Sequence, residues 1–155
     1  MVNLTADDKK NVQDTWAKVS AGGLPAVGLQ IFERFLRDNP AMIPKFPYAK
    51  GYSTIDELKA KNPEGLQEHA TLIITQVDSA VKHLNDEGAM KSELTALGSR
   101  HKNYDVQAAD FPHLGTSMMT VLKEALGGDF TSAVATSWGK VYEVISDTMI
   151  AAMHT

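Results

Sequence analysis

Residues 94–107 read LTALGSRHKNYDVQ, and they contain a histidine where an amphipathic helix would carry a leucine. Met90, Leu94, Leu97 and His101 are spaced by 4, 3 and 4 residues, which is the spacing of one helical face. An imidazole on such a face costs about 1–3 kcal/mol unless its nitrogens find hydrogen-bond partners. Either a backbone carbonyl or a buried water satisfies His101, or the ring binds something in the interior.

A second histidine interrupts the cleanest apolar stripe of the chain, which steps by 3 or 4 residues: Leu66, His69, Ile73, Val77, Ala80 and Leu84. For one histidine alone, a buried hydrogen bond is the simpler explanation. Two inward-facing histidines 32 residues apart, on separate helices, instead favour a shared cavity. Because the chain has no cysteine, histidine is the expected protein ligand for a metal ion or a haem iron.

The ligand spacing favours haem over zinc. Four-coordinate zinc requires three or four protein ligands, usually with two of them three or four residues apart. The helix that contains His69 offers no such partner, since His83 is fourteen residues further on. A planar cofactor that needs one strong axial ligand and an apolar slot agrees better with the two histidines.

Helical periodicity extends along the chain, and no segment alternates with the period of 2 that is typical of strands. Thr5 and Asp8 form a capping-box pattern, and Pro25 suits the first turn of a second helix. The other predicted inward rows are Val12, Trp16 and Val19; Val27, Ile31, Phe32 and Phe35; Phe111, Leu114, Met118, Val121 and Ala125; and Val134, Trp138, Val141, Ile145 and Met149. We therefore expect an all-α protein with six long helices and one or two short ones.

Composition limits the classes of partner. The 155 residues are 43% hydrophobic, which is enough for one core, so we expect a single domain over 1–155. With 15 basic and 19 acidic residues, the charge gives no case for nucleic acid or an anionic membrane as partner. The absence of cysteine excludes disulfides, and no apolar run reaches membrane-spanning length. We expect a soluble cytoplasmic protein that is a monomer or a weak homo-oligomer.

Five stretches, in this order, resemble the globin family. TADDKKNVQDTWAKV is similar to the first globin helix, and GLQIFERFLRDNPAMIPKF to the second helix and the corner that follows it. EGLQEHATLIITQVDSAVKHLND resembles the distal helix, LTALGSRHKNYDVQAADFPHLG the proximal helix and its exit, and SWGKVYEVISDTMIAAM the last helix. The stretch from HLNDEGAM to LGSRHKNY is especially similar to intracellular globins of polychaete worms. The resemblance implies a globin fold of six to eight helices around a pocket for haem b.

The resemblance also implies roles for individual residues. His101 corresponds to the proximal histidine that binds the haem iron, and His69 to the distal histidine that donates a hydrogen bond to bound O2. Phe46 corresponds to the phenylalanine that packs on haem, and Phe32 and Ile73 to residues beside the gas ligand. The remaining apolar haem contacts that it implies, each equally well explained by simple core packing, are Leu97, Val106, Phe111 and Leu114.

Arg100 is a candidate partner for a haem propionate, and an exposed, solvated arginine is the alternative. Three departures from the family affect the corners of the pocket. Many globins carry a second phenylalanine where this chain has Ala49, and Tyr48 is a candidate to compensate. The spacing of 32 between the histidines exceeds that of vertebrate myoglobins by about three residues, and polychaete globins share it. The turn that contains Tyr104 and Val106 is about one residue shorter.

The expected function is reversible binding of O2, and also of CO and NO, by a pentacoordinate haem for intracellular oxygen storage, facilitated diffusion or transport. We do not expect an enzyme in the first instance. Peroxidase or nitric-oxide dioxygenase activity on the same haem is one alternative. A redox protein or gas sensor in which both His69 and His101 bind the iron is another, and a haem-free helical scaffold is the simplest.

Overall fold

The described part of the chain, residues 3–101 and 108–153 of a computed structural model, is helical throughout and contains no strand. Its α-helices are α1 (Ala6–Ser20), α2 (Leu24–Asp38), α3 (Ile55–Lys61), α4 (Pro63–Lys82), α5 (Glu87–Arg100), α6 (Asp110–Leu126) and α7 (Ser132–Met153). Three short 3₁₀ helices accompany them: η1 (Pro40–Lys45), η2 (Pro47–Ala49) and η4 (Gly127–Asp129). The predicted all-α class is confirmed, with six long helices and the short α3.

Capping residues explain where several helices begin. The amide of Asp8 donates to Oγ1 of Thr5 over 3.1 Å, and the Thr5 amide donates back to Oδ2 of Asp8 over 3.0 Å, so the predicted capping box is present. Asn62 caps α4 by accepting from the amide of Gly65. Asp86 caps α5 in the same way.

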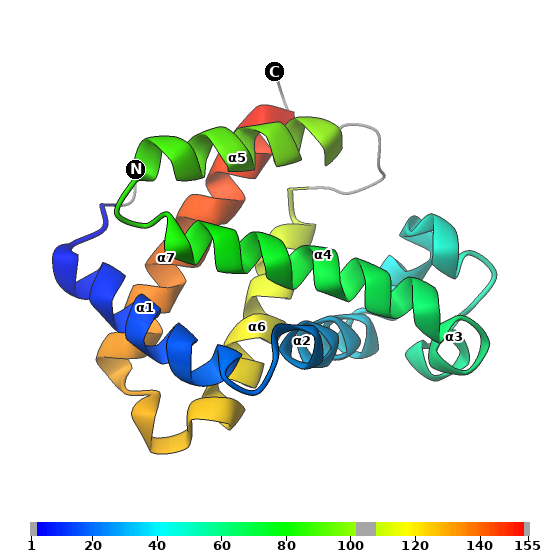
Figure 1. Ribbon diagram of the computed structural model, residues 1–155. Coiled ribbons are helices and arrows are strands. Elements are labelled where there is room, and N and C mark those ends of the chain that lie inside the picture. Colours follow the sequence, from blue (N-terminus) through cyan, green and yellow to red (C-terminus); the bar gives the residue numbers. More distant parts are fainter. Residues whose placement is uncertain (1–2, 102–107, 154–155) are drawn as a thin grey trace.

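Two glycines allow the helices that carry the histidines to pack closely on their neighbours. Figure 1 shows α4 running the width of the molecule across α2, and α5 lying against the far end of α7. A Cβ atom on Gly28 of α2 would lie 2.7 Å from the carbonyl oxygen of Ala70, and one on Gly98 of α5 would lie 2.5 Å from that of Met149. Such approaches are open only to a residue without a side chain.

These crossings shift the buried faces by one residue from those that the sequence predicts. In α4 the row that contacts α2 contains Ala70 and Ile74, both fully buried, whereas His69 and Ile73 are half-buried beside it. The predicted stripe still packs against the core, and the small Ala70 beside it lets the two backbones approach. The histidine lies at the edge of the packed face.

The predicted inward position of Ala125 is wrong, since this residue is exposed. The buried row of α6 continues instead in steps of three and four residues through Phe111, Gly115, Met118, Leu122 and Leu126. Ala125 lies at the side of that row in the last turn. The error affects the end of the helix away from the histidines.

Buried apolar side chains form two clusters. The larger one, the α1–α7 cluster, draws on α1, α2, α4, α5, α6 and α7 and contains Trp16 and Trp138 in tilted contact, with centroids 5.7 Å apart. The smaller one, the α2–α3 cluster, consists of Phe32, Phe35, Leu36, Met42, Ile43, Ala49, Ile55, Leu58, Leu66 and Ala70. Of the described side chains, half-buried Leu114 packs against both clusters.

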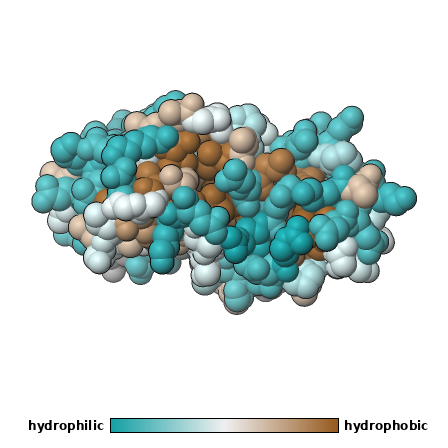
Figure 2. Space-filling view, turned by 90° about the horizontal axis from the view of Figure 1, so that it is seen from below, coloured by the Kyte–Doolittle hydropathy of each residue, from teal (hydrophilic) through white to brown (hydrophobic). Residues whose placement is uncertain are grey.

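None of the described helices is long and apolar enough to cross a membrane. Figure 2 shows the face seen from below in Figure 1, where hydrophobic groups lie in hollows between hydrophilic side chains. Leu72 on α4 is the large apolar side chain most exposed in the described ranges, at 70%.

Candidate functional site

His101 follows the last residue of α5 and is held by its own helix. Its Nδ1 lies 2.7 Å from the carbonyl oxygen of Leu97, and because a carbonyl can only accept, Nδ1 carries the proton. In a neutral imidazole this leaves the lone pair on Nε2, which is the form that coordinates a metal ion. A backbone carbonyl thus satisfies one nitrogen of His101, which is one of the two possibilities that the sequence left open.

His69 projects from α4 into a group of aromatic rings. The centroid of its imidazole lies 4.7 Å from that of Phe32 and 4.8 Å from that of Phe46, both in edge contacts. Tyr48 approaches from a third side at 5.4 Å. Phe32 is 1% exposed and itself contacts the Phe46 ring, so the distal side of the site is an apolar enclosure.

One polar contact reaches His69 inside this enclosure. Its Nδ1 lies 2.6 Å from the phenolic oxygen of Tyr48. The Tyr48 ring is stacked on Phe46, while Ala49, where many globins have a phenylalanine, is fully buried in the α2–α3 cluster. Sequence reasoning considered Tyr48 only as a replacement for that phenylalanine. The sequence shows this hydroxyl two residues after Phe46, but no helical pattern indicates that it contacts His69.

Both partners of that contact are neutral at physiological pH. Burial, and then the charge of His101, lower the pKa of His69 to about 4. Burial raises the pKa of Tyr48 well above its usual value.

The other candidate residues occupy different environments. Three candidate apolar side chains, from three different helices, are half-buried: Ile73, Leu97 and Leu114. Phe111 is buried in the α1–α7 cluster. Arg100 is exposed at the end of α5, and Val106 lies outside the described residues. The roles of these residues toward a cofactor stay predictions.

The chemistry of these groups fits a haem. Ile73 packs against the α2–α3 cluster, Leu97 against the α1–α7 cluster and Leu114 against both, and each keeps part of its apolar surface uncovered. Such surface between two clusters suits a flat apolar macrocycle, which would complete the core. His101 with its lone pair on Nε2 supplies the axial ligand that the iron requires.

An ion pair that the sequence analysis missed holds the corner beside Phe46. Nζ of Lys45 lies 3.0 Å from Oδ2 of Asp110, and both side chains are mostly buried, at 21% and 16% exposed. The pair joins η1 to the first residue of α6. Lys45 precedes Phe46 directly, so the pair helps to place that ring against His69.

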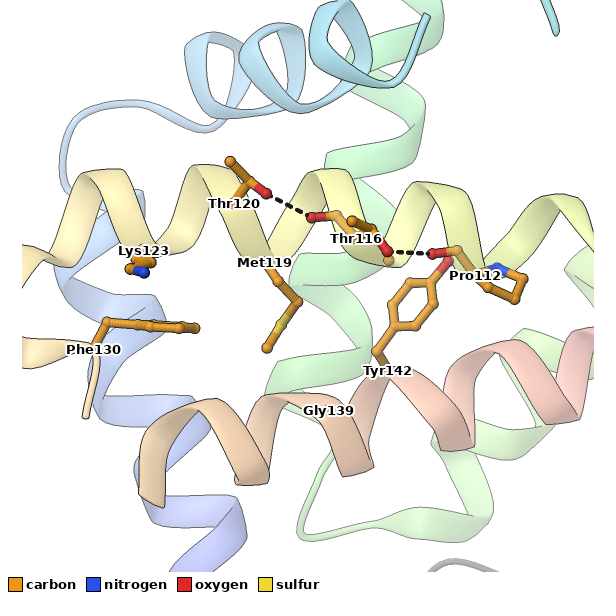
Figure 3. A pocket seen from close by; sticks show the side chains of 9 residues that line it. Pro112, Thr116, Met119, Thr120, Lys123, Phe130, Gly139 and Tyr142 are labelled. Atoms are coloured by element: carbon orange, nitrogen blue, oxygen red, sulfur yellow. Dashed lines mark hydrogen bonds between the residues drawn. The ribbon is translucent and has the colours of Figure 1, made fainter. Parts of the chain in front are cut away.

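A separate groove of about 440 Å³ lies between α6 and α7 (Figure 3). Met119, Phe130 and Tyr142 supply much of its apolar wall, and the hydroxyl of Tyr142 donates to the carbonyl of Phe111. Of the described residues that line it, Lys123 and Tyr142 alone are ionisable. The groove therefore offers no acid–base pair or metal-ligand set.

Comparison with known proteins gives the family of this helical protein. A family model described as globin matches residues 29–149, and the chain belongs to the globin family. The major polymeric globin component P1 of Glycera dibranchiata is 35% identical, with 99% of this chain and 100% of the relative covered. The chain is thus similar to invertebrate haemoglobins, as the sequence predicted.

More distant relatives include neuroglobins. The neuroglobin of Danio rerio is 28% identical, covering 96% of this chain and 92% of the relative. Among solved structures, a hexacoordinated haem protein from an anhydrobiotic tardigrade superimposes with a TM-score of 0.87 at 22% identity, covering 99% and 97% of the two chains. This likeness establishes the globin fold, and family membership supports haem-based gas binding.

Proposed function

We propose that this protein binds O2 reversibly on a b-type haem, pentacoordinate in the absence of gas, for storage, facilitated diffusion or transport inside a cell. The observation that carries the proposal is the setting of two imidazoles, one at the end of α5 and one on α4. One is held by the Leu97 carbonyl with its lone pair on Nε2, and the other is kept neutral among aromatic rings. His101 would hold the iron of a ferrous haem, which would supply the binding of O2, CO or NO.

His69 and the residues around it have different roles toward the bound gas. His69 donates a hydrogen bond to O2, which acquires partial negative charge, and so favours it over the less polar CO. Phe32, Phe46 and Ile73 keep water away from the gas, and this slows oxidation of the ferrous form. The relatives reported above are named as globins, which supports gas binding rather than catalysis as the main role.

A second candidate is a redox protein or gas sensor in which His69 and His101 both bind the iron. One observation favours it: the solved structure of similar fold is titled a hexacoordinated haem protein. The two candidates differ only in what occupies the sixth coordination position when no gas is present.

The visible absorption spectrum of the purified protein tests both candidates. A reduced form with one broad band that changes reversibly in air supports the pentacoordinate proposal. Sharp split bands in the reduced form support the bis-histidyl candidate. A chain that shows no haem absorbance after haem is supplied overturns both.

We also propose that the protein is a monomer or a weak homo-oligomer in the cytoplasm. Relatives from Glycera dibranchiata are named polymeric components, so self-association is the property to measure. Sedimentation equilibrium over a hundredfold range of concentration supports the proposal if the mass stays near 16.9 kDa or rises gradually. A stable oligomer at the lowest concentration overturns it.

A further inference from the structure

Three structural features fix the position of Tyr48 beside His69. Its ring stacks on Phe46 with an interplanar angle of 25° and a centroid distance of 5.8 Å. Its carbonyl oxygen accepts from the side-chain amide of Asn62 over 3.0 Å, and the same Asn62 caps α4. The absence of a side chain at Gly65 leaves room for the ring, since a Cβ there would lie 3.1 Å from it. The hydroxyl is therefore fixed relative to the helix that carries His69.

The contact between Tyr48 and His69 has two forms, and they give the histidine opposite properties. If the phenol donates, Nδ1 of His69 is the acceptor, and the proton of the neutral ring lies on Nε2. If Nδ1 donates to the phenol, the lone pair lies on Nε2 instead. The first form makes Nε2 a hydrogen-bond donor, and the second makes it a metal ligand.

We propose that Tyr48 is a positioning residue that holds His69 in the Nε2–H tautomer, so that His69 donates to the gas ligand and does not bind the iron. This inference rests on the proposed gas binding at the same pocket. It assigns the choice between the pentacoordinate and bis-histidyl states to one hydroxyl group.

The direction of the bond follows from the chemistry of the two groups. The phenol is a stronger acid than the N–H of a neutral imidazole, and an imidazole nitrogen is a stronger base than a phenolic oxygen. Burial keeps both groups neutral, because it lowers the pKa of His69 to about 4 and raises that of Tyr48. The arrangement in which O–H donates to Nδ1 is thus the more stable one, and 2.6 Å is a short distance for it.

Removing the hydroxyl should change the tautomer and the gas chemistry together. In Tyr48→Phe the ring still stacks on Phe46, but Nδ1 of His69 loses its donor. Nε2 then carries the proton for less of the time, so O2 should dissociate roughly 2- to 10-fold faster, the range expected for one net hydrogen bond. The bis-histidyl fraction of the reduced protein should rise by a similar factor.

Nitrogen NMR of the ferrous CO complex reports the tautomer of His69 and does not depend on any measurement of gas-binding rates. The full chain is labelled with ¹⁵N-histidine, and the signals of residue 69 are assigned by their loss in His69→Gln. In the wild type we expect a pyridine-like Nδ1 and a pyrrole-like Nε2. Tyr48→Phe should shift both toward intermediate values. Tyr52→Phe is the matched control, because Tyr52 is half-buried against the same α2–α3 cluster, and it should leave both signals unchanged.

The C–O stretching frequency provides an independent reading, since it falls when a hydrogen-bond donor faces the ligand. It should rise in Tyr48→Phe and stay constant in Tyr52→Phe. A pyridine-like Nε2 in the wild type, or unchanged nitrogen signals and C–O frequency in Tyr48→Phe, overturns the role of Tyr48 while gas binding stands. A chain that takes up no haem overturns the proposed function, and the role of Tyr48 with it.

Discussion

A Cβ atom on Gly98 would lie 2.5 Å from the carbonyl oxygen of Met149, so the backbones of α5 and α7 are nearly in contact. His101 caps the same helix three residues later, with its Nδ1 held by the Leu97 carbonyl. The crossing of α5 over α7 therefore sets the position of the proposed iron ligand. Gly98 therefore affects both the stability of the fold and the position of the proposed iron ligand.

Replacing Gly98 with alanine should push α5 away from α7. Overpacking of this kind costs about 1–3 kcal/mol in the free energy of unfolding, which urea denaturation of the haem-bound protein would measure. Transfer of haem to an acceptor protein should also become faster, because His101 moves with the helix. Gly88→Ala is the control, since Gly88 is exposed in the first turn of α5, and it should be neutral or slightly stabilising. Equal losses in the two variants would contradict this account.

Replacing His101 with glycine should remove the axial ligand and leave space for a small molecule. We expect the spectrum of the reduced protein to change and added imidazole to restore it, because free imidazole can occupy the vacated volume. His113→Gly alters an exposed histidine on α6 and should keep the wild-type spectrum. A His101→Gly protein with the wild-type spectrum in the absence of imidazole would show that another residue binds the iron.

Replacing His69 with leucine should speed the dissociation of O2 much more than that of CO. The lost hydrogen bond is worth about 1.5 kcal/mol, which corresponds to roughly 10-fold in the O2 dissociation rate. Stopped-flow displacement of each gas measures both rates on the same variant, so CO is the internal control. If both rates change by the same factor, His69 acts by size and not as a donor.

Asp8 should make the free energy of unfolding depend on pH in the acid range. The Thr5 amide, helped by the Ser137 hydroxyl and the Lys140 ammonium and opposed by burial, holds the pKa of Asp8 well below its usual range. A depressed pKa in the folded state contributes stability above the unfolded value of about 4, and this is lost as the pH falls toward the folded value. Asp8→Asn should be less stable at pH 7 by about 1–2 kcal/mol and should show a flatter profile below pH about 4.

Urea unfolding between pH 2.5 and 7 measures that profile. Asp7→Asn is the matched control, because Asp7 lies next to Asp8 in the first turn of α1 but is exposed. Parallel profiles for the wild type and Asp8→Asn would show that other groups cause the acid dependence.

The helices could be predicted from the sequence because each carries its own periodic and capping signals. Thr5 with Asp8 marked the first of them, and the spacing of three and four residues marked the others. The rotation of α4 could not be predicted, since it depends on the contact between Gly28 and Ala70, which are 42 residues apart in the chain. A pattern within one helix defines an apolar side but not which row of that side its neighbour covers.

The site could be predicted to the extent that it consists of residues that break a pattern. His69 and His101 stood out because an imidazole is costly on an apolar face. Tyr48 and the Lys45–Asp110 pair did not, because they lie outside the long helical stripes and gain their meaning from partners distant in sequence. Val106 stays a prediction, outside the described residues.

The division of the core has a consequence for fluorescence. Both tryptophans of the chain, Trp16 and Trp138, lie in the α1–α7 cluster, whereas Tyr48 and Tyr52 pack against the α2–α3 cluster. Tryptophan emission thus follows the melting of one part of the interior, whereas tyrosine absorbance reports on both parts, since Tyr142 packs against the α1–α7 cluster. A haem that bridges the two clusters would quench the indole emission and make the two optical transitions coincide. Their separation after haem loss would measure how strongly the cofactor joins the two parts.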